Sequence, residues 1–233
     1  MASHPLVLSP ALPTELLWYI IHSCAYPTTL IVGSSRSEFL ASLVQDVAIA
    51  RHIRIVFAPT VSHLRAFLSV FSVKDSKVPS PPSAVPVVPK PNTADTMKHP
   101  LLLIYGFLHI HRETSEWSVQ GLSNTAAVFV EAARRVAFQA VVVEPIIAHE
   151  GEEERDPMTL LLTEMVPILS GSARRAGPGL AGSGWTGKTV DVRRVLGRWF
   201  RFKSCDWGPR DGDENNAHTP EKHNSFIEND DMT

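Results

Sequence analysis

Two loops in this sequence have the composition of a phosphate-binding loop. The first, Gly33-Ser34-Ser35-Arg36-Ser37, follows the apolar run at 28–32 and precedes a helical pattern that includes Phe39. Glycine and serine at a strand-to-helix turn leave backbone N–H groups that hold an anion, and a guanidinium such as that of Arg36 is a good phosphate partner. The pattern predicts either a degenerate nucleotide-binding loop or a purely structural turn.

The second loop, Gly182-Ser183-Gly184-Trp185-Thr186-Gly187-Lys188-Thr189, satisfies the P-loop pattern G-x-x-x-x-G-K-[ST] in full. In a working P-loop Gly182 and Gly187 shape the loop, while Lys188 and Thr189 reach the phosphates and the metal ion. That chemistry requires a buried strand directly before the loop and a helix directly after it. The nearest expected strand ends near Leu169, so we interpret the match as coincidental. An active nucleotide hydrolase that uses these residues is the alternative.

The first loop lacks the charges that phosphoryl transfer needs. Its phosphate-binding lysine is replaced by Arg36 or Ser37, and Tyr105 stands at the end of the strand where a Mg²⁺-binding acid is expected. Without these two groups the transition state loses its main charge stabilisation. The sequence therefore predicts no catalytic residue and no required cofactor, with ATP binding kept as an alternative.

Two further groups of residues have chemical potential. His109 and His111, with Glu113 or Glu116, have the spacing of an acid-base pair or a metal site, but no second cluster of ligands accompanies them, and we expect no bound metal. A basic set near the C-terminus, interleaved with tryptophans, suits phosphate contacts and base stacking on single-stranded DNA. The alternative is that its aromatic side chains are core and its arginines are solvated. The DNA-binding candidates are Arg174, Arg175, Lys188, Arg193 and Arg194.

The elements that position these loops follow an α/β pattern. An uninterrupted apolar strand at 101–105, a helix that Thr114 or Ser115 can cap, and a second buried strand at 140–144 form a strand-helix-strand unit. Such units build parallel sheets with helices on both faces. Further strands are expected at 28–32, 53–57, around 165–169 and, at an edge, 199–203.

Length and composition indicate one domain with flexible additions. The chain has 233 residues, of which 44% are hydrophobic, and its net charge of -2 gives no global bias towards nucleic acid or membranes. Two cysteines fit a reducing compartment, and neither a secretion signal nor an apolar run long enough to cross a membrane is expected. The predicted organisation is a flexible segment at 1–13, a domain at 14–203 with a disordered Pro-rich insertion at 74–99, and a disordered acidic tail at 204–233.

The order of these elements resembles the RecA-like ATPase core. The degenerate loop at 32–39, the strand at 100–106 and the strand at 140–144 follow that core in order, and the stretch from Trp185 to Phe202 is similar to the end of recombinase paralogues. Within this family the chain resembles the degenerate members, namely the Shu-complex subunits and the SWIM-domain-associated RecA-like protein. The likeness covers about residues 28–203.

The resemblance implies a three-layer RecA-like (P-loop NTPase-type) α/β fold with a mostly parallel central sheet. It also implies a nuclear, non-catalytic subunit that assembles with other RecA-like or SWIM-domain subunits, contacts single-stranded DNA and supports recombinase filaments in homologous recombination. The alternative within the same fold is a cytoplasmic Elongator-type accessory subunit that serves tRNA modification.

Overall fold

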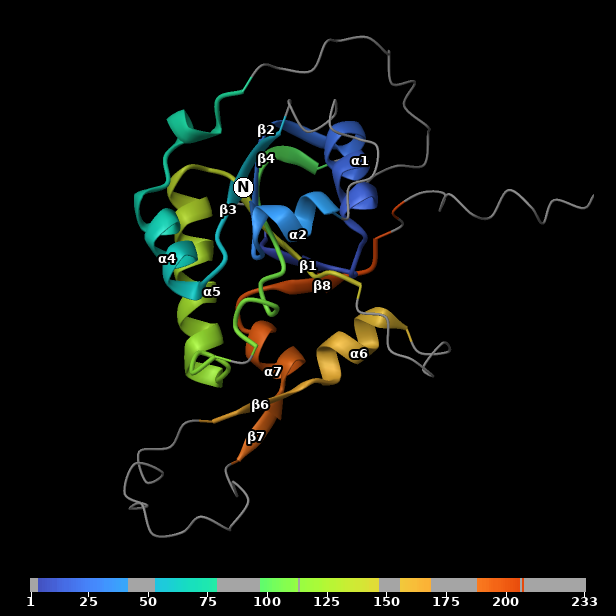
Figure 1. The fold of residues 1–233 in the computed structure, drawn as a ribbon, viewed down its shortest axis with the longest axis vertical. Coiled ribbons are helices and arrows are strands. Elements are labelled where there is room, and N and C mark those ends of the chain that lie inside the picture. The colour runs from blue at the N-terminus through green and yellow to red at the C-terminus, as the bar shows by residue number, and fades with distance from the viewer. Residues whose placement is uncertain are drawn as a thin grey trace, which may run out of the picture.

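The computed structural model describes residues 4–41, 53–78, 97–112, 114–146, 156–168, 188–205 and 207. Within these ranges, six strands form one sheet in which every neighbouring pair is parallel (Figure 1). In spatial order the strands are β3 (Arg54–Phe57), β2 (Cys24–Val32), β4 (Met97–Tyr105), β5 (Gln139–Val143), β1 (Leu6–Leu8) and β8 (Arg201–Lys203).

Helices cover both faces of this sheet and bury two separate apolar clusters. One face carries α1 (Pro13–Ser23) and α2 (Arg36–Ala41). The other carries α4 (Val61–Val70), α5 (Val119–Arg135), α6 (Pro157–Thr163) and α7 (Val192–Leu196). The molecule therefore has an α/β architecture with helical layers on either side of a parallel sheet, as the sequence predicts.

A short antiparallel ribbon lies apart from the main sheet. It consists of β6 (Met165–Pro167) and β7 (Thr189–Asp191), which extend beyond α6 and α7 (Figure 1). A 3-10 turn, η1 (Val73–Ser76), follows α4. None of the described helices is long and apolar enough to cross a membrane.

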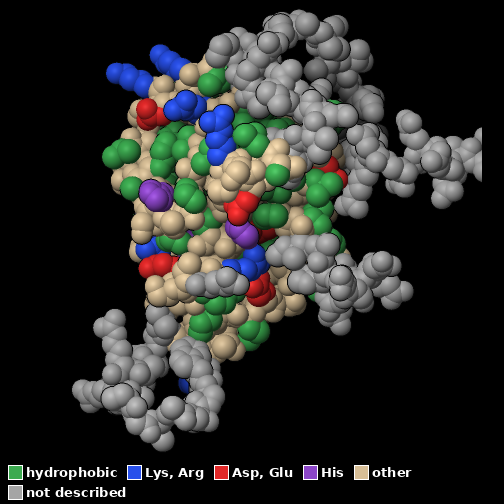
Figure 2. Space-filling model, viewed as in Figure 1, with side chains coloured by type: hydrophobic (Ala, Val, Ile, Leu, Met, Phe, Trp, Pro, Cys, Tyr) green, Lys and Arg blue, Asp and Glu red, His purple; other side chains and the backbone are tan. Residues whose placement is uncertain are grey.

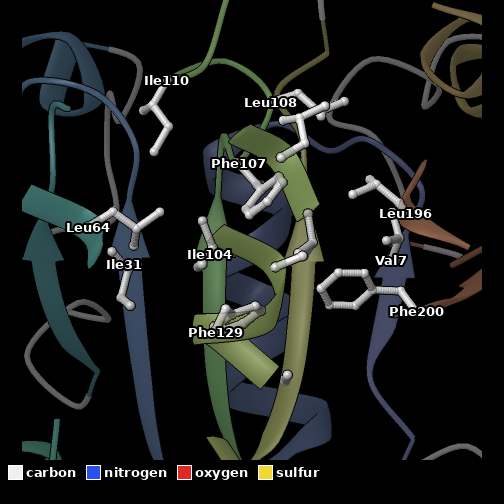
Figure 3. Close-up of a cluster of buried hydrophobic side chains, with 14 of the residues drawn as sticks. Val7, Ile31, Leu64, Ile104, Phe107, Leu108, Ile110, Phe129, Leu196 and Phe200 are labelled. Carbon is white, nitrogen blue, oxygen red and sulfur yellow. The ribbon is translucent and has the colours of Figure 1, made fainter. Parts of the chain in front are cut away.

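The central strand β4 explains why the sheet requires cover on both sides. Its residues 101–105 are buried, with Leu102 and Ile104 in the cluster under α4 and α5, and Leu101 and Leu103 in the cluster under α1. Figure 3 shows Ile104, Phe107 and Phe129 at the centre of the first cluster. An uninterrupted apolar run is what a strand buried on both faces needs.

The strands β2 and β4, which contain the runs expected at 28–32 and 101–105, lie side by side. Their register runs from Thr28 opposite Leu101 to Val32 opposite Tyr105. The degenerate loop that follows Val32 and the end of β4 at Tyr105 thus lie at the same edge of the sheet.

The chain termini differ from the sequence prediction. Within the segment predicted to be flexible, Leu6–Leu8 form β1, which pairs with both β5 and β8, and Val7 is fully buried. In the predicted tail, Trp207 is buried against α1, whereas 206 and 208–233 lie outside the described residues. The prediction is wrong at Leu6–Leu8 and at Trp207 for the same reason: these short stretches show no pattern of their own, and distant strands and helices bury them.

Two element boundaries also differ. The cap of α5 is Ser118, whose side chain accepts a hydrogen bond from the Gly121 amide, rather than Thr114 or Ser115. Thr114 instead donates its hydroxyl to the carbonyl of His111 at 2.6 Å. Ahead of β6 the chain forms α6, which begins at Pro157 with Asp156 as its cap.

The insertion predicted at 74–99 is described only at its two ends. Its first residues belong to η1 and its last residues to the start of β4. The segment 79–96 lies outside the described residues.

Replacing Phe129 with alanine tests the larger cluster. The Phe129 side chain is fully buried. Its ring centroid lies 6.2 Å from that of Phe200, the residue directly before the edge strand β8. We expect Phe129→Ala to lower the free energy of unfolding by about 3–5 kcal/mol, measured by chemical denaturation. Val70→Ala, at a position that is 74% exposed, is the control and should change it by less than about 0.5 kcal/mol. Equal losses in the two variants would contradict this description of the core.

Candidate functional site at the carboxyl ends of the strands

Open parallel sheets bind ligands at the carboxyl ends of their strands, where neighbouring strands send their following helices to opposite faces. In this sheet β2 and β1 lead to helices on one face, whereas β4 and β5 lead to helices on the other. β3 also leads to a helix on the second face, α4, so the strand order places such positions at the β3–β2, β2–β4 and β5–β1 boundaries. At the first of these the Ala58 amide donates to the Val32 carbonyl at 2.9 Å. The candidate site consists of the loops at the other two boundaries, which leave β2, β4, β5 and β1.

The position between β2 and β4 is filled by backbone. The Gly33 amide donates to the Tyr105 carbonyl at 2.8 Å, and the Gly106 amide donates to the Val143 carbonyl at 2.9 Å. A Cβ atom on Gly33 would lie 2.5 Å from the Gly106 carbonyl oxygen and 2.6 Å from Ile110. Glycine at position 33 therefore permits the two loops to touch, which is a packing role.

The rest of the degenerate loop caps α2. The Ser35 amide donates to the Glu38 carboxylate at 2.8 Å, and the Glu38 amide donates to the Ser35 hydroxyl at 3.3 Å. Hydrogen bonds from the Ser35 backbone and side chain lower the pKa of Glu38. The Glu38 carboxylate thus accepts the hydrogen bond of the Ser35 amide, which a phosphate at this helix start would otherwise accept. Arg36 and Ser37 are exposed beside it.

Of the five residues of the predicted nucleotide loop, 33–35 connect β2 to α2, and Arg36 and Ser37 begin the helix. The contacts just given match the structural alternative that the sequence left open, because Gly33 and Ser35 direct their amides to the chain's own oxygens. Nucleotide binding by this loop stays a prediction.

The position between β5 and β1 is closed by side chains and backbone together. The Ala11 amide donates to the Glu144 carbonyl at 3.0 Å, and the Ala11 carbonyl accepts from the Tyr105 hydroxyl at 3.0 Å. The Trp207 indole donates to the Pro10 carbonyl at 3.1 Å. Burial, with the charges of Glu144 and Glu15, raises the pKa of Tyr105, so its phenol remains a donor. The residue at the expected acidic position thus holds the β1–α1 loop against the sheet.

A buried carboxyl group, Glu144, lies at the end of β5. Its two oxygens accept from the Leu108 amide at 2.7 Å and the His109 amide at 3.3 Å. Burial raises the pKa of Glu144 to about 7, although both amides and the charge of Arg112 act in the opposite direction. From the sequence alone, Glu144 is placed only at the end of a strand. An acid directly after an apolar run and before Pro145 was the available signal.

An ion pair connects the same turn to the antiparallel ribbon. Arg112 donates to both oxygens of Glu164, at 3.0 and 2.6 Å, and its guanidinium lies 5.8 Å from the centroid of the Trp117 ring. Figure 2 shows basic, acidic and histidine side chains close together near the middle of this face. The bidentate geometry fixes the position of Glu164, which immediately precedes β6.

The two histidines of the sequence analysis have different surroundings. His109 is exposed, whereas His111 is buried and bonds through its two ring nitrogens to the Phe107 carbonyl at 2.7 Å and the Thr125 hydroxyl at 2.9 Å. Burial lowers the pKa of His111 to about 4. Arg65 also donates to Thr125, at 2.9 Å. His111 is therefore a neutral, structural member of a polar network between the turn and α5.

Arg65 ties that network to the start of α5. It donates to the Glu116 carboxylate at 2.6 Å and to the Gly121 carbonyl at 3.0 Å. Among the described side chains, no group of three or more His, Cys, Asp or Glu residues is arranged to hold a metal ion.

The C-terminal candidates lie elsewhere. Gly182, Gly187, Arg174 and Arg175 are outside the described residues. Thr189 begins β7, and the Lys188 carbonyl accepts from the Ile168 amide at 2.8 Å. A strand thus follows the P-loop pattern at the position where the motif needs a helix.

The described basic residues flank the ribbon. Lys188 precedes β7, and Arg193 and Arg194 project from α7, whose apolar residues face the core. All three side chains are exposed. Trp199 packs against the first cluster. Its ring is therefore part of the core, which agrees with the alternative that the aromatic side chains of the basic set belong to the core.

Comparison of the chain with protein-family models, with curated proteins and with solved structures found no match. The assignment of a function therefore depends on the geometry of the described residues and on the chemistry of the sequence.

The closure between β2 and β4 gives a prediction for Gly33→Ala. Because the added Cβ would meet the Gly106 carbonyl, we expect the free energy of unfolding to fall by about 1–3 kcal/mol. Ser34→Ala is the matched control, since the Ser34 hydroxyl makes only a long 3.4 Å bond to the next carbonyl, and should cost less than about 0.5 kcal/mol. Chemical denaturation measures both. A stable Gly33→Ala protein would mean that the two loops do not touch.

Glu144 and His111 give opposite dependences of stability on pH. The folded state raises the pKa of Glu144 from 4.5 to about 7, so it binds more protons than the unfolded state in this interval, and stability falls as pH rises through it. The folded state lowers the pKa of His111 from 6.5 to about 4, so the unfolded state binds more protons there, and stability falls as pH drops through it. Each effect amounts to about 3 kcal/mol.

Single variants separate the two effects. Relative to the wild type, Glu144→Gln should remove the loss of stability between pH 4.5 and 7, and His111→Gln should remove the loss between pH 6.5 and 4. Denaturation across this pH range measures both slopes, and the other titrating groups cancel in the differences. Three parallel pH profiles would refute the assignment.

Proposed function

We propose that this chain is a non-catalytic, RecA-like subunit of a DNA-repair complex that supports recombinase filaments through contacts with other RecA-like or SWIM-domain subunits. The single observation that carries the proposal is the closure of the carboxyl edge of the sheet by the chain's own groups. Amides of Gly33, Gly106 and Ala11 all donate to carbonyls of neighbouring strand ends.

Closure of this edge opposes nucleotide hydrolysis for a chemical reason. A working site turns loop amides and a lysine towards the phosphates and places a carboxylate on the metal ion. Here the Ser35 amide bonds to Glu38, and the phenol of Tyr105 bonds to the Ala11 carbonyl. The buried acid, Glu144, accepts two backbone hydrogen bonds and serves to hold the turn that follows β4.

Exposed apolar side chains on one face support a role in assembly. Leu12, the N-cap residue of α1, and Trp18 within α1 are 45% and 44% exposed, and Leu40 on α2 is 43% exposed. Large apolar side chains, tryptophan above all, supply much of the binding energy at protein interfaces. The face covered by α1 and α2 is therefore the surface that we assign to the partner subunit.

The exposed cations near α7 support contact with single-stranded DNA. Lys188, Arg193 and Arg194 lie close in sequence, at the ribbon and at the first turn of α7. The nearby Asp191 carboxylate accepts a hydrogen bond from the Arg194 amide at 2.6 Å. Cations grouped in this way neutralise backbone phosphates without reading sequence.

The partner surface predicts the behaviour of a pair of variants. We expect Leu40→Glu to weaken co-purification with the partner at least about tenfold, because a charge there would have to be desolvated on binding. Val70→Glu, at a more exposed position on α4 across the sheet, should leave it unchanged. The measurement is affinity purification of the tagged full chain, with circular dichroism to check that both variants fold.

The proteins recovered decide between the alternatives. A recombinase paralogue or a SWIM-domain protein supports the proposal, and Elongator subunits would replace it with a role in tRNA modification. Titration with a fluorescent ATP analogue provides the third arm, for which we expect no saturable binding. Binding that Lys188→Ala abolishes would instead assign an active nucleotide hydrolase to 182–189.

A further inference from the structure

The sheet has two edge strands, β3 and β8, at its opposite ends. Within the described residues β3 pairs only with β2, and β8 pairs only with β1. A strand with one neighbour uses half of its backbone N–H and C=O groups, and the other half point away from the sheet. Proteins protect such edges with charged side chains or cover them with another part of a chain. The two edges of this sheet differ in which of these solutions their residues permit.

The β8 edge carries charges that oppose pairing with a second copy of itself. Its three residues are Arg201, Phe202 and Lys203. Two copies of an edge strand extend a sheet when they pair antiparallel about a two-fold axis perpendicular to it, and residues on the same face then lie opposite one another. With the axis at Phe202, Arg201 lies opposite Lys203 of the second copy, and with the axis at either cation that residue lies opposite itself. Like charges directly opposite are destabilising, so every register is unfavourable.

The β3 edge has the opposite character. Its residues Ile55, Val56 and Phe57 are apolar and only half-buried. Ile55 and Phe57 pack against the cluster beneath α1 and α2, so Val56 faces the side of the sheet that carries α4. Arg54, at the first position of β3, is the one charged residue of the strand. This edge therefore presents apolar side chains on both faces and a single charge at one end.

One antiparallel register matches these side chains to a second copy of the strand. With the two-fold axis at Val56, that residue lies opposite its own copy, and Ile55 lies opposite Phe57 of the second copy on either side of the axis. Cross-strand pairs of an aromatic and a β-branched side chain are among those that stabilise a sheet. Arg54 then lies opposite Ala58 of the second copy, so the two Arg54 residues are separated by four positions, or about 13 Å along the strands.

The largest of these side chains is already ordered within one copy. The Phe57 ring meets the Phe39 ring edge to face, with centroids 6.0 Å apart, and Phe39 is itself buried. Phe39 in turn lies edge to face with Tyr105, with centroids 6.0 Å apart. A side chain that is fixed before association loses less conformational freedom when a partner covers it.

We propose that two copies of this chain associate through β3, which pairs antiparallel with β3 of the second copy about an axis at Val56 and continues the sheet from one copy into the other. A second copy is the occupant because the strand is complementary to itself: apolar side chains meet apolar side chains, and no two like charges lie opposite. The surface is an edge of the sheet rather than the face covered by α1 and α2, so this inference is independent of the proposed function.

Sedimentation of the purified full chain over a series of concentrations tests the association. We expect the wild type to show an equilibrium between monomer and dimer. Val56→Lys should raise the dissociation constant at least about tenfold, because it places two ammonium groups opposite one another at the axis. Val56→Thr keeps the β-branched shape without a charge and should retain the dimer. Circular dichroism checks that both variants fold, and the lysine stem can follow the apolar surface until its charge reaches water.

Cysteine substitution locates the axis without weakening the dimer. In a full chain whose Cys24 and Cys205 are replaced by serine, Val56→Cys places two thiols directly opposite one another, with Cα atoms about 4.5–5.5 Å apart. A disulfide spans this separation, so mild oxidation should convert the dimer into a covalent one on a non-reducing gel. Arg54→Cys, on the same face of the same strand, is the matched control and should not cross-link, because its two sulfur atoms lie too far apart.

Four results would each overturn the proposal. A wild type that stays monomeric at every concentration would leave the β3 edge to a strand of another chain. Species that grow beyond the dimer would indicate head-to-tail pairing of β3 with β8, which does not close. A dimer that Val56→Lys leaves unchanged, or cross-linking as efficient at position 54 as at position 56, would place the contact elsewhere.

Discussion

Backbone groups that are buried at the ends of strands need hydrogen-bond partners, because water does not reach them. In this protein the loops that leave β1, β2, β3 and β4 meet that requirement by donating an amide to the end of a neighbouring strand. Nucleotide-binding sheets use the same amides differently and direct them towards phosphate. Pairing them within the sheet stabilises the frame and removes the donors on which phosphate binding depends. The donor and acceptor pairs are Gly33 to Tyr105, Gly106 to Val143, Ala11 to Glu144, Ala58 to Val32 and Ser9 to Lys203.

The parts of the fold that the sequence predicts are those with local signals. The apolar run of β4, the amphipathic α5 and the strand before Pro145 each carry their pattern within a few residues, and all three form as expected. β1 has no such signal, since Leu6–Leu8 lie between two prolines and become buried only through β5 and β8. The helix α6 also carries a local signal, Asp156 followed by Pro157, but the sequence analysis assigned only the strand around 165–169 in this stretch and no helix before it.

The site shows the same division. Sequence identifies the turn at 33–37 and the missing acid at Tyr105, because both follow from residue type at a strand end. It does not identify Glu144 or His111 as buried titratable groups, since their burial depends on the turn after β4 and on α5, which come from elsewhere in the chain. A polar residue acquires a shifted pKa from its neighbours in space, and one sequence does not list those neighbours.

The two ends of the chain complete the sheet together. Within the described residues β8 pairs only with β1, and β1 is held between β8 and β5. Trp207 packs on Tyr19 of α1, and its indole N–H donates to the carbonyl of Pro10 in the loop that follows β1. Contacts between such distant positions carry a loop-closure cost, which is offset by the burial of Val7 in one apolar cluster and of Trp207 in the other. Closure of the carboxyl edge at β1 thus depends on segments from both ends of the chain, because the Ser9 hydroxyl and the Pro10 carbonyl bind the segment that follows β8.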